Sequence, residues 1–201
     1  MGRRSDHSRE ELEALILDAG QNLMAQVGFA HFSAREVAKR IGYSVGTIMH
    51  LFSSVDHLVL AINSRTFLLW TAWLEERLSG VSGNDRIYAL VQGYFDFAAH
   101  HHNLWSAIYE HRLPADMAMP DAHNELRGCL MTLVEQEIAA VLPHVEQDEV
   151  ARLARSLVAS VHGHCAFALS GSFALLGEDA PLDLAMQRVI DTLRAQGAPS
   201  F

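Results

Sequence analysis

Apolar side chains recur every three or four residues along almost the whole chain, which is the spacing of one face of an amphipathic helix. The alternation of single apolar and polar residues that marks a half-buried strand is nearly absent. In the segment 9–28, one helical face would hold Leu12, Leu15, Ile16, Ala19, Leu23 and Val27. The pattern predicts an all-α protein.

Helix starts and stops divide this pattern into segments. Serines that can cap a helix N-terminus stand at Ser8, Ser33, Ser44 and at Ser53 or Ser54. A glutamate follows both Ser8 and Ser33 three residues later, which is the spacing of a capping box. Glycines, prolines and polar clusters interrupt the pattern elsewhere. The predicted helices cover about 9–28, 34–41, 45–51, 55–78, 85–101, 103–112, 121–142, 147–176 and 182–196.

The second and third predicted helices have the pattern of a helix-turn-helix. Gly42 lacks a Cβ and can form the tight turn, and Ala38 is small enough for the helices to cross closely. The apolar residues that would hold the two helices together are Val37, Ile41, Ile48 and Phe52. The front of the second helix would then be free to enter the major groove of DNA. The sequence therefore predicts a DNA-binding domain over 1–54 and a helical-bundle domain over 55–201.

These residues resemble the TetR family of transcriptional regulators. The resemblance rests on Gly28-Phe29, on the run SAREVAKRIGYSVGTI from Ser33 to Ile48, and on Phe52 and Leu58. It covers about residues 9–60 without a gap. It implies a homodimer that binds a pseudo-palindromic operator in double-stranded DNA and a small-molecule effector in its C-terminal domain. By this resemblance we expect a repressor that a small, largely apolar effector releases from its operator.

The residues at the front of the two short helices are candidates for DNA contact. The hydroxyls and first-turn amides of Ser33 and Ser44 can bind phosphate, although capping alone also explains a serine there. The Arg35 guanidinium can donate two hydrogen bonds to a guanine edge. The full predicted set is Ser33, Arg35, Ser44, Val45, Gly46, Thr47, Met49 and His50.

Three positions depart from the family pattern. The family usually has Tyr where Met49 stands, Tyr or His where Leu51 stands, and Lys where Val55 stands, and these groups usually contact phosphates. Phosphate contacts supply much of the affinity for DNA. The departures leave open a second hypothesis, a ligand-binding helical dimer in which DNA binding is weakened or lost.

The segment 55–201 carries a further resemblance. Val161-His162-Gly163 and Leu169-Ser170-Gly171 look like the His-Gly element of one TetR subgroup, which usually has Trp in place of Val161. The family places its effector among the middle helices, where apolar walls with few polar groups suit a ligand. The ligand-binding candidates are Phe67, Trp70, Tyr94, Phe95, Trp105, Tyr109, Met117, Cys129, His162 and Phe167. The family dimerises through its last two long helices, and the interface candidates are Leu153, Leu157, Ser160, Leu184, Val189 and Leu193.

Charge is distributed unevenly along the chain. The formal net charge is -9, from 15 basic and 24 acidic residues. Residues 1–65 hold seven of each, which leaves eight basic and seventeen acidic residues for the remainder. Only the neutral first third is therefore suited to approach phosphates.

The remaining chemistry changes this interpretation little. Two distant cysteines do not form a disulfide framework, and no signal-peptide pattern opens the chain, so we expect a cytoplasmic protein with no membrane contact. None of the 12 histidines lies three or four residues from another, and no HExxH occurs. We expect no cofactor and no enzyme activity. Ligands from different helices can still converge on a metal, so an all-helical metal-dependent enzyme stays open as the third hypothesis.

Overall fold

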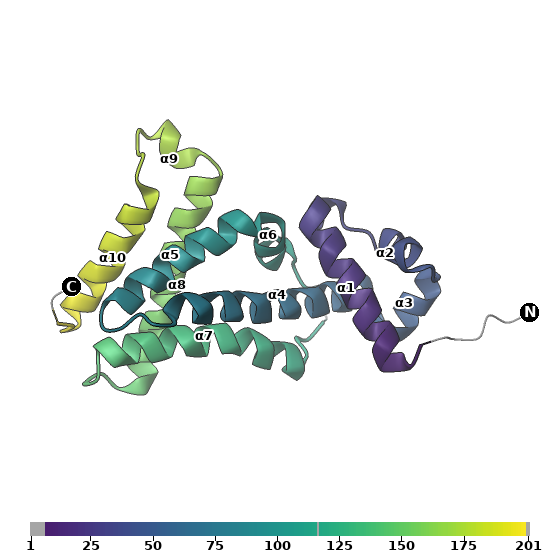
Figure 1. Cartoon of the computed structure of the whole chain (residues 1–201), viewed down its shortest axis with the longest axis horizontal. Coiled ribbons are helices and arrows are strands. Elements are labelled where there is room, and N and C mark those ends of the chain that lie inside the picture. The colour runs from purple at the N-terminus through teal and green to yellow at the C-terminus, as the bar shows by residue number, and fades with distance from the viewer. Residues whose placement is uncertain (1–6, 116, 200–201) are drawn as a thin grey trace, which may run out of the picture. The chain divides into compact units, whose positions relative to one another are not determined.

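The computed structural model describes residues 7–115 and 117–199. Within these ranges every regular element is a helix, which confirms the all-α prediction. In chain order they are α1 (Arg9–Val27), η1 (Phe29–His31), α2 (Ala34–Ile41), α3 (Val45–Phe52), α4 (Val55–Leu78), α5 (Asp85–His100), α6 (His102–Glu110), α7 (Asp121–Val141), α8 (Gln147–Leu169), α9 (Ser172–Leu175) and α10 (Pro181–Ala195) (Figure 1).

The chain divides into two compact units. The first comprises Met1–Phe67 and His101–Leu126, and the second comprises Leu68–His100 and Arg127–Phe201. Helices α4 and α7 each begin in the first unit and end in the second. The predicted DNA-binding segment 1–54 therefore shares its unit with the first half of α4 and with all of α6.

One hydrophobic core holds the first unit together. Helix α1 packs on α2 and on α6, and α2 packs on α3. The buried side chains of α1–α3 are continuous with those of α4 and α6, so the helix-turn-helix is not an independent core. This core consists of Leu12, Ile16, Leu23, Met24, Ala34, Val37, Ala38, Ile48, Phe52, Leu58, Val59, Ile62, Leu104 and Ala107.

A glycine sets the approach of α1 to α4. A Cβ built on Gly20 would lie only 2.8 Å from Cδ1 of Ile62, so a larger residue would press on the buried α4 side chain. The Arg65 guanidinium of α4 also forms an ion pair with the Asp18 carboxylate of α1. Together these contacts fix α1 along the first turns of α4.

Three of the predicted caps are confirmed. At α1, the Glu11 amide donates to Ser8 Oγ over 3.2 Å and the Ser8 amide donates to Glu11 Oε2 over 2.7 Å, which completes the capping box. Ser44 Oγ accepts the amide of Thr47 at the start of α3. Ser54, one of the two serines predicted for α4, accepts the amide of residue 57.

The capping box predicted at α2 is wrong. Ser33 makes no side-chain cap bond there. The Glu36 carboxylate instead lies 3.6 Å from Arg40 Nε and 3.8 Å from Lys39 Nζ. Because two cations lie one turn further along α2, the carboxylate turns toward them rather than back to the helix start.

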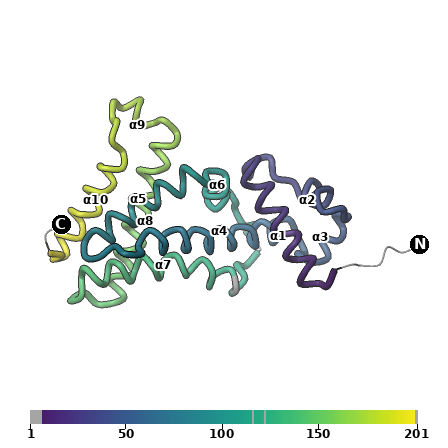
Figure 2. The backbone as a smooth tube through the Cα atoms, viewed as in Figure 1, coloured from purple at the N-terminus to yellow at the C-terminus, as the bar shows by residue number. Residues whose placement is uncertain are grey.

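In the second unit, α8 and α10 lie side by side and α5 packs against both (Figure 2). The prediction of one helix over 147–176 is wrong in its last turns, because α8 ends at Leu169. Gly171 has φ 73° and ψ 6°, a left-handed conformation that stops a right-handed helix. The single-turn helix α9 then leads toward α10.

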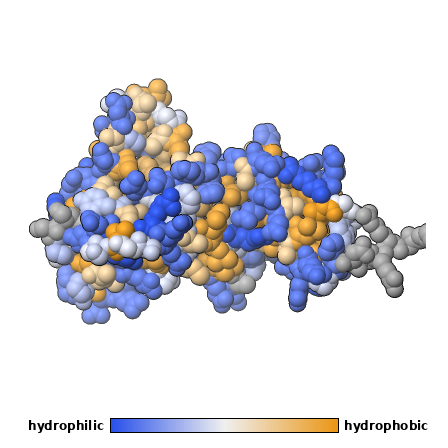
Figure 3. Space-filling model, in the orientation of Figure 1, coloured by the Kyte–Doolittle hydropathy of each residue, from blue (hydrophilic) through white to orange (hydrophobic). Residues whose placement is uncertain are grey.

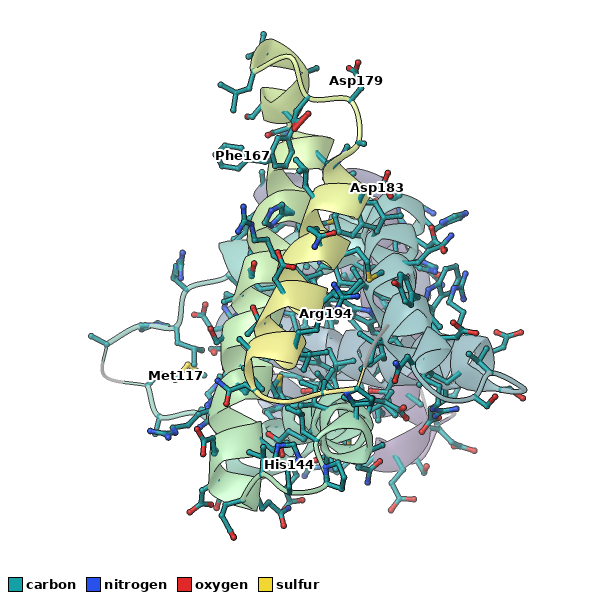
Figure 4. The ribbon with its side chains drawn as sticks, turned by 90° about the vertical axis from the view of Figure 1, so that its left-hand side faces the viewer. Met117, His144, Phe167, Asp179, Asp183 and Arg194 are labelled. Carbon is teal, nitrogen blue, oxygen red and sulfur yellow. The ribbon has the colours of Figure 1, made fainter. Side chains whose placement is uncertain are left out.

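The end of the second unit at α9 is apolar and exposed. Leu175 and Leu176 are 89% and 72% exposed, and apolar residues gather over α9 in Figure 3. Phe167 is 50% exposed and projects from the side of α8 (Figure 4).

No single helix among the described residues is apolar and long enough to cross a membrane. The pair α3 and α4, bent by 72° at its break, meets the criteria of length and composition when the two helices are taken together.

The turn glycine gives a test of the fold. Gly42 has φ +72° and a Cβ there would meet no atom within 4 Å, so Gly42→Ala imposes only backbone strain. We predict that it lowers the free energy of unfolding by about 1–2 kcal/mol. As a matched control, Gly128→Ala in the middle of α7 also meets nothing, and should raise that free energy by about 0.5–1 kcal/mol. Urea denaturation measures the free energy of unfolding of both variants. Equal effects of the two substitutions would contradict the left-handed conformation assigned to Gly42.

Candidate functional site

The turn between α2 and α3 has the geometry that the helix-turn-helix prediction requires. Gly42 is left-handed, with φ 72° and ψ 25°, and the Tyr43 amide donates to the Ala38 carbonyl over 3.0 Å. Val37 and Ile48 are fully buried, and Ala38 is 2% exposed. The two short helices are therefore fixed to one another and to the core of the first unit.

One edge of this pair faces outward. Arg35 and Lys39 stand one turn apart on α2, and Gly46 and His50 stand one turn apart on α3; all four are exposed. Ser44, at the start of α3, is exposed as well. Basic side chains, a bare stretch of backbone and a helix N-terminus on one edge suit contact with a phosphate backbone and base edges.

The predicted DNA-binding residues do not all lie on this edge. Val45 and Met49 are half-buried and pack against the core of the first unit. Thr47 is also half-buried, and its hydroxyl lies 3.0 Å from Ser44 Oγ. Ser33 is half-buried, and its carbonyl accepts the first helical amide of α2, from Val37. Of the predicted set, Arg35, Ser44, Gly46 and His50 are the exposed members.

A neighbouring aromatic residue was missed by the sequence reasoning. The Tyr43 hydroxyl lies 2.9 Å from His7 Nδ1, and the two rings are in edge contact with centroids 6.2 Å apart. Tyr43 directly precedes Ser44, so this pair joins the segment before α1 to the start of α3. The feature of the sequence that could have indicated this contact is the aromatic residue Tyr43, directly after the turn glycine.

Helix α6 is attached at both ends to other helices of the first unit. At its start, Asn103 Nδ2 donates to the carbonyl of Ala25 near the end of α1, over 2.8 Å. Just after its end, His111 Nε2 lies 3.0 Å from the Asp56 carboxylate in the first turn of α4, and the His111 ring contacts Phe29 of η1. A displacement of α6 would therefore act on α1, η1 and α4 together.

A small polar group lies among aromatic side chains of the second unit. The Trp70 ring is stacked on Phe97, with centroids 4.7 Å apart, and meets the Tyr94 ring edge-on at 4.8 Å. The Tyr94 hydroxyl lies 3.0 Å from His162 Nδ1. Burial lowers the pKa of His162 below its ordinary value, which favours the neutral imidazole at pH 7. Three of the predicted ligand-binding residues, from α4, α5 and α8, are thereby in contact.

The other ligand-binding candidates are dispersed. Cys129 and Phe167 are exposed on the second unit, and Phe95 is half-buried. Trp105 and Tyr109 are in ring contact, one turn apart on α6, in the first unit. That unit also holds Phe67 and Met117, both half-buried. The other cysteine, Cys165, is fully buried, and burial raises the pKa of its thiol to about 12.

The predicted dimer residues divide by burial. Leu157, Val189 and Leu193 lie in the core of the second unit, where they hold α8 and α10 together. Leu153, Ser160 and Leu184 are half-buried and retain an accessible side. An exposed face of α8 also carries the small residues Ser156, Ala159 and Gly163.

Metal-binding side chains do not cluster in the described part of the chain. No three histidine, cysteine, aspartate or glutamate side chains come together there as a metal site requires.

A compact helix-turn-helix with an exposed basic edge, in an all-helical chain with a second helical unit, defines a DNA-binding transcriptional regulator. The chain belongs to the TetR family. The family's N-terminal domain, described as bacterial regulatory proteins of the tetR family, matches residues 16–62. The tetracyclin repressor-like C-terminal domain matches residues 87–193. None of the curated proteins matches the chain significantly.

Solved structures share this fold. A protein of unknown function from Rhodococcus sp. RHA1 is 21% identical, with a TM-score of 0.70 over 96% of this chain and 98% of its own. A transcriptional regulator from the same organism is 23% identical, with a TM-score of 0.64 over 94% and 98%. The transcriptional regulator FadR from Bacillus subtilis, solved in complex with stearoyl-CoA, is 13% identical, with a TM-score of 0.64 over 90% and 96%.

The burial of His162 predicts a dependence of stability on pH. Its folded pKa lies below the ordinary 6.5, so below about pH 6.5 the unfolded chain binds a proton that the folded chain resists. The stabilising contribution of the neutral ring is thus present above that pH and is lost as pH falls through the folded pKa. We predict that His162→Gln reduces the fall in urea midpoint between pH 7.5 and pH 5.5. His31→Gln, at an exposed position of η1, is the control. An unchanged pH dependence in the His162 variant would refute the assignment.

Proposed function

We propose that the chain acts as a dimeric repressor, which contacts operator DNA through Arg35, Ser44, Gly46 and His50 and leaves it when a small, largely apolar effector binds. The observation that supports the DNA-binding assignment is that these four residues are exposed on a two-helix pair whose opposite side is fixed in the core. Thr47 adds its methyl group at the margin of this edge, and Ser33 its backbone near the start of α2.

The shared core supports the regulatory half of the proposal. Helix α4 runs without a break from the first unit into the second, and α6 is bonded to the DNA-binding part at both ends. An effector that favours one arrangement of these helices would change the affinity for DNA by its differential affinity for the two arrangements. A coupling free energy of about 1–3 kcal/mol is sufficient for regulation.

The homodimer would form through the outer face of α8 and α10. Ser156, Ala159 and Gly163 would let two copies of α8 approach closely, because the distance between packed helices depends on the side chains at the contact. The exposed Phe167 and Leu175 would add apolar area at the end of this face. Two-fold symmetry would then present two recognition helices to half-sites one or more DNA turns apart, about 34 Å per turn.

A second candidate function is a helical ligand-binding dimer with weakened DNA binding. The exposed Val55 favours it: this side chain is 43% exposed and has no donor, where the family usually carries a lysine. Selection of bound fragments from genomic DNA, followed by a gel shift over a range of salt concentrations, separates the candidates. A salt-dependent shift supports the repressor, and no shift even at low salt supports the second candidate.

Arg35 tests the DNA-binding edge. Arg35 is exposed and forms no ion pair with another described residue, so Arg35→Ala should leave stability unchanged. We predict that it weakens binding to the selected DNA by about 1–3 kcal/mol. Gly46→Ala, whose Cβ would meet only Ser44 Oγ at 3.5 Å, should fold normally yet also bind more weakly, because the backbone could no longer approach the groove. Fluorescence anisotropy measures both, with exposed Arg127→Ala of α7 as the control. Full affinity in both variants would place the DNA elsewhere.

The α8 face is tested by oligomeric state. Gly163 is exposed and a Cβ there meets no atom within 4 Å, so the single chain accommodates Gly163→Arg. We predict that this variant sediments as a monomer at concentrations where the wild type is a dimer, because the buried guanidinium would lack a partner. Ala139→Arg, at an exposed position of α7, should remain dimeric. A dimeric Gly163→Arg variant would move the interface away from this face.

A further inference from the structure

The indole N–H of Trp70 has no hydrogen-bond partner among the described residues. Its side chain is fully buried, and its indole N–H donates to no oxygen or nitrogen atom in the described part of the chain. Buried donors in native proteins are almost always paired, so an unpaired one calls for an explanation. The neighbouring Trp73 shows the contrast, because its indole N–H donates to the Gly93 carbonyl over 3.2 Å.

The Trp70 ring contacts two aromatic side chains, and one of them forms a polar pair with a histidine. Phe97 stacks on the Trp70 ring and Tyr94 meets it edge-on. The Tyr94 hydroxyl, in contact with His162, is the polar pair. All of these residues belong to the second unit, and they come from α4, α5 and α8.

The arginines of this unit are bound elsewhere or exposed, and burial lowers the pKa of His162, the histidine in contact with Tyr94, which favours its neutral form. Arg86 is bound to the Glu137 carboxylate and to the carbonyls of Leu78 and Val81. Arg77 lies over the Trp73 ring and beside an aspartate. The remaining arginines of the unit are exposed, at Arg127, Arg152, Arg155, Arg188 and Arg194. Because burying an unpaired charge is costly, a ligand among these aromatic residues has to be neutral.

We propose that the effector is a neutral aromatic molecule that carries a carbonyl oxygen, and that this oxygen accepts the hydrogen of Trp70 Nε1. The aromatic part packs against Phe97 and Tyr94, and the hydroxyl of Tyr94 is the second polar contact. This inference rests on the proposed function, in that it specifies the effector of that regulator. The Tyr94 ring face is a competing acceptor for the same hydrogen, and the comparison of a ketone with a hydrocarbon below separates the two.

The test compares three probes of similar size on the full chain. Acetophenone has the ring and the carbonyl, ethylbenzene lacks the oxygen, and benzoate carries a charge. With indole-¹⁵N-labelled protein, we expect acetophenone to bind at least about tenfold more tightly than ethylbenzene and to shift the Trp70 indole proton downfield. Benzoate should bind most weakly. Equal binding of ketone and hydrocarbon, tightest binding of benzoate, or no binding of any probe would overturn the proposal.

Two tryptophan variants form a matched pair. Trp70→Phe should abolish the preference for the ketone, whereas Trp73→Phe, which removes an indole that is already bonded to Gly93, should preserve it. If Trp70→Phe does not fold, the indole shift in the wild type decides. Fluorescence anisotropy with the selected DNA is measured separately. If acetophenone binds but does not release the DNA, the ligand assignment stands and the repressor mechanism is contradicted. If no probe binds and the protein still binds DNA, only the ligand assignment is contradicted.

Discussion

The helix-turn-helix of this protein has no separate hydrophobic core. It is held by a core that it shares with α4 and α6. Its buried side chains are continuous with Leu58 and Ile62 of α4 and with Leu104 of α6, and α1 is seated against α4 at Gly20. Close-packed interiors transmit displacements rather than absorb them. A displacement of α6 or of the first turns of α4 would therefore act on the helix-turn-helix through this shared core.

The same constraint limits which side chains α3 can present to solvent. One side of this eight-residue helix has to complete the core, and Ile48, Phe52, Val45 and Met49 supply it. A side chain that packs inward cannot also reach a phosphate. The exposed positions left at the front of α3 are Ser44, Gly46 and His50, which offer backbone and a helix N-terminus rather than long polar side chains.

Sequence reasoning succeeded where the cause is local. The turn at Gly42 and the cap at Ser44 act over three or four residues, so the helix-turn-helix was predictable almost to the residue. It failed where two local signals compete, as at Glu36, which pairs with Arg40 instead of capping α2. Contacts between residues far apart in the sequence leave no periodic signal. The bonds of α6 to α1 and α4, and the meeting of Trp70, Tyr94 and His162, therefore emerged only from the three-dimensional arrangement.

The unpaired indole N–H of Trp70 can be compared with the other buried polar groups of the protein. In the second unit, the ion pair between Arg86 and Glu137 is fully hydrogen-bonded. The Arg86 guanidinium donates to the Glu137 carboxylate and to two backbone carbonyls. In the first unit, Asn63 donates to the Ala107 carbonyl, although its own Oδ1 is unpaired. An unpaired buried donor costs about 1–3 kcal/mol, a large part of the roughly 5–15 kcal/mol that stabilises a domain. The carbonyl oxygen of the proposed effector would supply the acceptor that the Trp70 indole lacks among the described residues.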